Sequence, residues 1–196
     1  MFKIGITGGI GSGKTTICKI FESLGIPVYY ADLEARRLIQ EHPALIDGYR
    51  KLFGEKAFVH GKLNRSHVAN MIFHDPELVS KVNALVHPVV REDFLQWSRQ
   101  QNAPYVIEEA AVLLESGGNH FLDKIILVSA PEEIRIARVV QRDGINEEDV
   151  ARRMKHQWND DKKRQLCNFE ITADDNHLVV PQVLKIHFEL LQIWDC

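Results

Sequence analysis

The stretch that most constrains the fold is GITGGIGSGKTT, residues 5–16, in which four glycines fall within six positions. Glycine this dense is costly in chain entropy unless the backbone must adopt conformations that other residues avoid. The pattern Gly-x-x-x-x-Gly-Lys-Ser/Thr is met by Gly8, Gly13, Lys14 and Thr15. An apolar strand pattern precedes the loop and an amphipathic helix pattern follows it. We therefore expect a phosphate-binding loop.

Such a loop works because its glycines let several backbone N–H groups converge on phosphate oxygens at a helix amino terminus. Lys14 is expected to bring a cation to the β- and γ-phosphates, and the Thr15 hydroxyl to coordinate Mg²⁺. The motif predicts ATP or another nucleoside triphosphate as ligand, but not the reaction. The residues expected to bind it are Gly9, Ile10, Gly11, Ser12, Gly13, Lys14, Thr15 and Thr16.

Strand and helix patterns alternate along most of the chain, which predicts an α/β protein with a parallel sheet covered on both faces. The expected strands are 2–7, 27–31, 104–110, 124–130 and 168–172. The expected helices outside the insertion are 14–24, 131–144, 146–158 and 178–194. Between them, helical periods recur over 33–101 without a convincing strand. We expect a nucleotide-binding core formed by 1–32 and 102–196, with 33–101 as a helical insertion.

Three acidic residues follow expected strands, where ligands of open α/β sheets gather. Asp32 is either a general base for an attacking hydroxyl or only the N-cap of the next helix. Glu108 and Glu109 end the third strand, and one of them could bind Mg²⁺ or orient Lys14. Adjacent strand residues point to opposite faces, so only one can enter the site.

Basic residues are spaced on one face of the expected helix 131–144, at Arg135, Arg138 and Arg142. Arg152 and Arg153 follow. These arginines either neutralise charge on a transferred phosphoryl group or form a solvated face paired with Glu132 and Glu133. In the insertion, His87 and Arg91 are further candidates, although a lone histidine there is more often structural.

Composition limits the class of protein. The net charge of −3 gives no global basic field, which argues against a general nucleic-acid binder. The three cysteines, Cys18, Cys167 and Cys196, show no metal-ligand spacing and fit a reducing compartment. The start lacks signal-peptide features, and no apolar run approaches the ~18 residues of a membrane span. We expect a cytoplasmic protein that spans no membrane.

With these motifs placed, the sequence resembles the dephospho-coenzyme A kinase family over essentially its full length. The sequence Gly-Gly-Ile-Gly-Ser-Gly-Lys is a more specific signal than the general phosphate-binding loop pattern. The resemblance rests on IGITGGIGSGKTT (4–16), ADLEAR (31–36), HPVVREDF (87–94), LLESG (113–117), RVVQRDGINEEDVARRMKHQ (138–157) and a degenerate CNFEIT (167–172).

The resemblance implies a three-layer P-loop NTPase fold with a five-stranded parallel sheet, a helical substrate-binding domain and a mobile lid at about 142–158. It implies transfer of the ATP γ-phosphoryl group to the ribose 3′-hydroxyl of dephospho-coenzyme A, the last step of coenzyme A synthesis.

The resemblance also assigns roles to single residues. Asp32 matches the proposed base, and Lys14 and Arg142 join it as expected catalytic residues. Arg138, Arg142 and Arg153 match lid positions. The expected substrate-binding residues are Asp32, Arg36, His87 and Arg91.

Several positions depart from the family pattern without touching the phosphate-binding loop or Asp32. They are Ala111 for Pro, Leu114 for Phe, Arg135 for Gln, Cys167-Asn168 for Ala-Asp, and Ala173 for Asn. The change at 173 weakens any expectation of how the adenine is held.

Two rival functions remain open on the residues. One is another small-molecule kinase, acting on a nucleoside or nucleoside monophosphate. The other is a non-catalytic nucleotide-dependent switch, although the Asn-Lys-x-Asp tetrapeptide of GTP-binding switches is absent. A monomer is expected, with a small homo-oligomer as the alternative.

Overall fold

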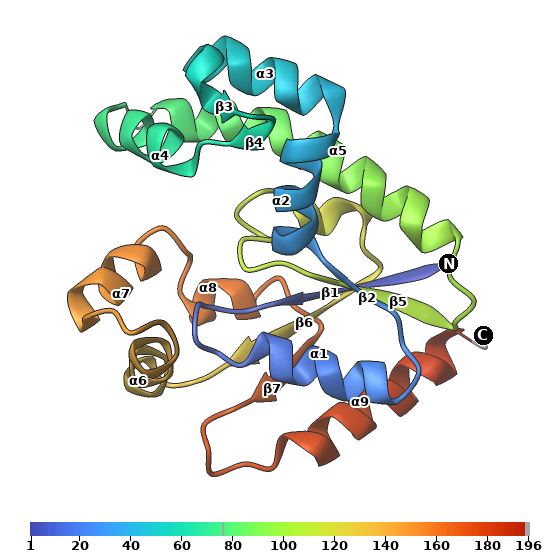
Figure 1. Ribbon diagram of the computed structural model, residues 1–196. Coiled ribbons are helices and arrows are strands. Elements are labelled where there is room, and N and C mark those ends of the chain that lie inside the picture. Colours follow the sequence, from blue (N-terminus) through green and yellow to red (C-terminus); the bar gives the residue numbers. More distant parts are fainter. Residues whose placement is uncertain (76, 195–196) are drawn as a thin grey trace. The chain divides into compact units, whose positions relative to one another are not determined.

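The computed structural model describes residues 1–75 and 77–194 (Figure 1). Five parallel strands form one sheet in the order β2-β5-β1-β6-β7, which confirms the expected α/β class. The strands are β1 (Phe2–Thr7), β2 (Val28–Tyr30), β5 (Tyr105–Glu109), β6 (Lys124–Ser129) and β7 (Phe169–Thr172). β1 lies in the centre, so the loop that follows it opens at the middle of the sheet's carboxyl edge.

Two helices cover one face of this sheet. α1 (Lys14–Ser23) and α9 (Val179–Trp194) lie side by side in Figure 1 and pack together. Ile17 and Phe21 of α1 are buried with Ile4 and Ile6 of β1 and Leu190 of α9. This apolar core holds the start of α1 against the end of β1, which fixes the span of the loop between them.

Local signals fix where the helices begin and end. α1 ends before Gly25, whose φ of +82° lets the chain reverse while Ile26 N donates to Phe21 O. α6 (Glu132–Asp143) ends at Gly144, φ +65°. α7 (Glu147–Met154) begins at Asn146, whose side chain accepts a hydrogen bond from Asp149 N at 2.8 Å, as expected of an N-cap.

The expected single helix over 146–158 is wrong at its carboxyl end. α7 stops at Met154, and a second helix, α8 (Asp160–Arg164), begins after the N-cap Asn159. The chain turns away between them because Trp158 N donates to the side chain of Glu115, 2.8 Å away, instead of to the preceding helical turn.

Contacts divide the chain into two units, Met1–Tyr30 with the chain from Trp97 onward, and Ala31–Gln96. The second unit contains four helices within the described residues. They are α2 (Ala31–Glu41), α3 (Pro43–Phe53), α4 (Arg65–His74) and α5 (Glu77–Arg99), the last continuing into the first unit.

The second unit also holds a small hairpin that the sequence analysis did not expect. β3 (Phe58–Val59) pairs antiparallel with β4 (Lys62–Leu63) after a short 3₁₀ turn, Glu55–Ala57. His60 and Gly61 connect them with φ of +49° and +75°, the conformation of a tight hairpin turn. Strands of two residues are too short to show an alternating pattern, which is why periodicity missed them.

Two expectations drawn from composition, one about the cysteines and one about membrane spans, can be compared with the described residues. Cys18 and Cys167 carry free thiols, while Cys196 lies outside the described residues. Burial raises the pKa of both described thiols, which keeps them protonated and unreactive. Within the described chain, none of the helices combines the length and apolarity that a membrane span needs.

Candidate active site

The loop between β1 and α1 can adopt its path only with glycine at two points. A Cβ on Gly8 would lie 2.2 Å from Val128 O of β6, and one on Gly11 would lie 2.4 Å from Arg135 O of α6. Gly13, with φ of +96°, is the residue that caps α1. The loop is therefore pressed closely against β6 and α6.

Lys14 reaches back over this loop. Its Nζ donates to Gly8 O at 3.0 Å and to Gly9 O at 3.3 Å, and lies 3.9 Å from Glu109 Oε1. The side chains of Lys14 and Glu109 are only about one-tenth exposed. A buried cation is thus held at the mouth of the loop, paired with the last residue of β5, where a polyphosphate would need a counter-charge.

Glu108 points to the other side of the sheet. It stands in register with Gly5, whose missing side chain leaves room for Leu113 and Leu122 on that side. Burial raises the pKa of Glu108 to about 7, and its Oε2 has no hydrogen-bond partner among the residues that the structure describes. Of the two adjacent glutamates, Glu109 is therefore the one beside Lys14.

The outer turn of the loop, Gly9–Ser12, is held by two side chains, one from the helix that precedes α7 in the sequence and one from the segment that follows α7. Ser12 N donates to Gly9 O at 3.1 Å and closes the turn. Ile10 N donates to Gln157 Oε1 at 2.8 Å, and Arg138 donates to Gly11 O at 3.4 Å. Three hydrogen bonds therefore hold this turn in place.

The arginines of α6 have different surroundings. Arg135 is buried, and its Nη1 stands 1.8 Å from where a Cβ on Gly9 would be and 3.9 Å from Asp160 Oδ1. Arg138 donates to Ala173 O and Asp175, while Arg142 is exposed and paired with Asp143. The alternative of a solvated face does not hold for Arg135, which is buried beside Gly9 of the loop.

A cavity of about 390 Å³ opens beside the start of α1. Its size suits a nucleoside. Arg138 and Asp175 form one wall, joined by a 2.5 Å ion pair in which Asp175 takes a φ of +66°. The lining residues are Gly13, Thr16, Ile17, Arg138, Ala173, Asp175, His177, Leu178 and Val179. Ala173, a departure from the family pattern, thus lies in this wall and contributes its carbonyl to Arg138.

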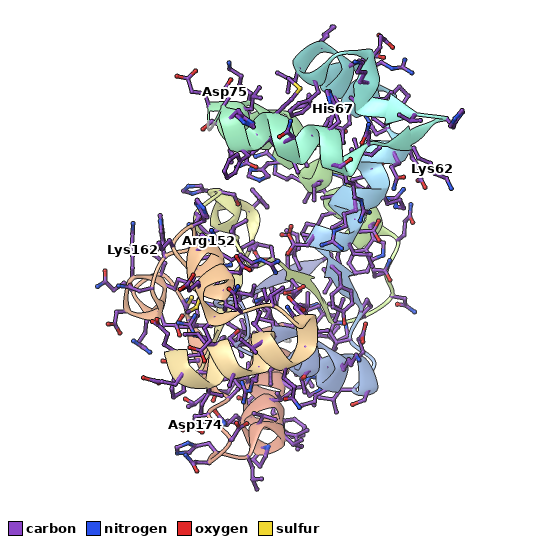
Figure 2. All side chains as sticks on the ribbon, turned by 60° about the vertical axis from the view of Figure 1, so that its left-hand side comes forward. Lys62, His67, Asp75, Arg152, Lys162 and Asp174 are labelled. Carbon is purple, nitrogen blue, oxygen red and sulfur yellow. The ribbon has the colours of Figure 1, made fainter. Side chains whose placement is uncertain are left out.

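The segment after α7 is anchored by residues that the sequence analysis did not single out. Glu115 Oε1 accepts from Trp158 N and lies 3.1 Å from Nζ of the fully buried Lys163. Lys163 also donates to Ala111 O. Figure 2 labels Arg152 on α7 and Lys162 on α8, the two helices that this anchor separates. The quoted segments LLESG and RMKHQ contain Glu115 and Gln157, but neither motif indicates their contacts.

The remaining candidates belong to the helical unit. Asp32 is the second residue of α2, so it lies inside the first helical turn and is not the N-cap. Its side chain is exposed. Burial lowers the pKa of His87 on α5, and the negative charge of Asp32 opposes that shift. The Arg37–Asp93 ion pair, 3.2 Å, ties α2 to α5. Arg36 on α2 and Arg91 on α5 are exposed.

The structure therefore groups the predicted residues in two sets. The loop residues, Lys14, Arg138 and Glu109 gather in the first unit, where Arg142 and Arg153 lie further out and both contact Asp143. Asp32 and His87 belong to the second unit and are close enough to interact electrostatically. Figure 2 labels His67, on α4 of the same unit. The first set thus combines a glycine loop with a buried ammonium, and the second contains an exposed carboxylate.

Comparison with known proteins agrees with this geometry. The family model described as dephospho-CoA kinase matches residues 2–178. A dephospho-CoA kinase of Bacteroides fragilis is 38% identical, the match covering 94% of this chain and 90% of that protein. A crystal structure of a protein from Thermus thermophilus superposes with a TM-score of 0.85 at 33% identity, covering 96% of each chain.

A solved dephospho-CoA kinase from Campylobacter jejuni, at 23% identity, shares the fold with a TM-score of 0.70 over 97% of each chain. The family match spans the phosphate-binding loop, Asp32 and the whole segment of α6, α7 and α8. The chain belongs to the dephospho-CoA kinase family.

Proposed function

We propose that this protein transfers the γ-phosphoryl group of ATP to the ribose 3′-hydroxyl of dephospho-coenzyme A, giving coenzyme A and ADP. The observation that carries this function is the family match over residues 2–178, which includes an intact phosphate-binding loop. Membership of this family makes the chain an ATP-dependent kinase and its reaction the last step of coenzyme A biosynthesis.

The ATP phosphates bind to the loop 9–16, through backbone amides other than that of Ile10, which donates to Gln157, and to the Lys14 ammonium. Lys14 Nζ lies within 3.3 Å of two loop carbonyls, which supports its role as the cation that meets a β- or γ-oxygen. The nucleoside binds in the cavity beside Gly13, between Arg138 and Val179. Positioning and electrostatics supply most of the catalysis in phosphoryl transfer.

The residues at the mouth of the loop fit a Mg²⁺ ion. Thr15, in the first turn of α1, offers an exposed hydroxyl, and Glu109 offers a carboxylate beside Lys14. Among the described residues, no three His, Cys, Asp or Glu side chains form a metal cluster, in keeping with an ion held mainly by phosphates and water. When bound, Mg²⁺ neutralises charge on the β- and γ-oxygens.

Asp32 accepts the proton of the ribose 3′-hydroxyl. Covalent geometry supports this role, because Asp32 is two residues beyond Tyr30, which pairs in register with Glu109. Two residues span at most ~7 Å, so the backbone of Asp32 stays near the strand end that carries Glu109. Arg36, His87 and Arg91 bind the coenzyme A precursor from the same helical unit, which acts as the substrate-binding domain.

Residues 142–158 act as a lid that closes over the triphosphate and excludes water. Arg142 and Arg153 are exposed and both paired with Asp143, so closure can exchange that carboxylate for a phosphate. Arg138 stays at the inner end of the lid, against Gly11 O. The protein acts as a monomer in the cytoplasm.

One assay tests the function. The protein is incubated with Mg-ATP and, separately, dephospho-coenzyme A, pantetheine compounds, nucleosides and nucleoside monophosphates, and products are identified by mass and by the position of the new phosphate. We expect a product only with dephospho-coenzyme A. That product should be coenzyme A, with the new phosphate at the ribose 3′ position. Phosphorylation of nucleoside monophosphates alone would instead support the other small-molecule kinase, and nucleotide binding without turnover would support a switch.

A further inference from the structure

In the turn Gly9–Ser12, the backbone N–H of Ile10 finds its acceptor outside the loop. In a turn closed by Ser12 N and Gly9 O, the N–H of the second residue, Ile10, points outward. A half-buried N–H needs an acceptor. Gln157 Oε1 is that acceptor, 2.8 Å from Ile10 N and separated from it by 147 positions in the sequence.

Gln157 is itself held firmly in place. Its own N–H donates to Met154 O at 2.9 Å, the last turn of α7. The next residue, Trp158, donates its N–H to Glu115, and Glu115 is fixed by the buried ammonium of Lys163. The Gln157 carboxamide is thus presented to the loop from a backbone that is tied to the core on its carboxyl side.

We propose that Gln157 is a positioning residue for the phosphoryl donor. By holding the Ile10 amide, it fixes the turn that leads into the amides at the start of α1, which bind the β- and γ-phosphates. It also ties the carboxyl end of the lid to the phosphate-binding loop, as Arg138 ties the other end through Gly11 O. This inference rests on the proposed function only in taking ATP as the donor.

A neutral acceptor is what this position requires. A glutamate at 157 would still accept the Ile10 hydrogen bond but would place a negative charge beside a polyphosphate. A methionine would keep the length of the side chain and remove the acceptor. These two substitutions therefore separate the hydrogen bond from the charge.

The experiment compares the wild-type protein with Gln157→Met, Gln157→Glu and the control Gln165→Met, an exposed glutamine that follows α8. ADP affinity is measured by calorimetry without any acceptor, and the KM values for ATP and for dephospho-coenzyme A are measured separately. Amide hydrogen exchange at Ile10 is followed in the nucleotide-free protein.

For Gln157→Met we expect ADP affinity to fall about 3- to 10-fold, the factor that a neutral hydrogen bond contributes. The KM for ATP should rise by the same factor while the KM for dephospho-coenzyme A stays constant, and Ile10 exchange should accelerate. Gln157→Glu should keep the slow Ile10 exchange yet bind ADP more weakly, most clearly at low salt. Gln165→Met should match the wild type.

Gln157→Met with wild-type ADP affinity and wild-type KM for ATP would overturn the inference. So would equal rises in both KM values, which indicate a general disturbance of the site. Because ADP binding needs no acceptor, weakened binding in Gln157→Met supports the inference even if the wild-type protein forms no coenzyme A, an outcome that would refute only the proposed function.

Discussion

Lys14 and Glu109 face each other at the mouth of the phosphate-binding loop, with Nζ 3.9 Å from Oε1 and both side chains nearly buried. The pair joins the first residue of α1 to the last residue of β5, the strand next to β1. The carboxylate therefore helps to hold the ammonium at the loop, where we propose that it meets the triphosphate.

Replacing Lys14 with methionine should lower kcat by at least about 100-fold, because the ammonium stabilises charge on the transferred group. Steady-state kinetics with Mg-ATP and dephospho-coenzyme A measures the loss. Lys19→Met, at an exposed position of the same helix, is the matched control and should leave kcat unchanged. Equal activity of the two variants would refute the assigned role.

Asp32→Asn should lower kcat by a factor on the order of 10² to 10⁴, the usual contribution of a general base. ADP affinity, measured by calorimetry, should stay at the wild-type value because the substitution leaves the phosphate-binding loop intact. Asp47→Asn, on the exposed surface of α3 in the same unit, is the control. Near-normal turnover by Asp32→Asn would assign the proton to another group.

Arg142→Met should lower kcat by about 100-fold or more while changing ADP affinity little, since the side chain is expected to act on the transition state. The Arg142–Asp143 pair is exposed and screened by solvent, so protein stability should hardly change. Arg152→Met on α7 removes a lid arginine without an assigned role and serves as control. A thermal melt of each variant checks folding, and equal kcat values for the two would contradict the prediction.

Glu108 should make stability depend on pH. Its folded-state pKa is raised from 4.5 to about 7 by burial, so the folded protein binds a proton that the unfolded chain releases. The free energy of unfolding should therefore fall as pH rises from 4.5 to 7, by an amount on the order of 3 kcal/mol, and then level off.

The glutamine of the Glu108→Gln variant does not titrate, so the variant should lack this dependence of the free energy of unfolding on pH. Denaturant unfolding of wild type and variant between pH 5 and 8 provides the measurement, and the difference between the two curves cancels the other titrating groups. As pH rises, the free energy of unfolding of the variant should increase relative to that of the wild type. Two parallel curves would show that Glu108 ionises normally in the folded protein.

Much of the fold followed from local patterns in the sequence. The glycine spacing, Lys14 and the flanking apolar periods predicted β1, the loop and α1, because contiguous residues define that geometry. Two strands of two residues, and the end of α7 at Met154, were not predicted. The first are too short for periodicity, and the second depends on Glu115, 43 positions from Trp158.

The sequence by itself determined that a glycine loop lies between a strand and a helix and to which family the chain belongs, and it predicted that this loop holds a triphosphate. Only the tertiary structure decided that Glu109 rather than Glu108 meets Lys14, that Arg135 lies under Gly9, and that Gln157 holds Ile10. Each of these contacts joins residues far apart in the chain. Such contacts depend on strand order and helix packing, which no local pattern of residues encodes.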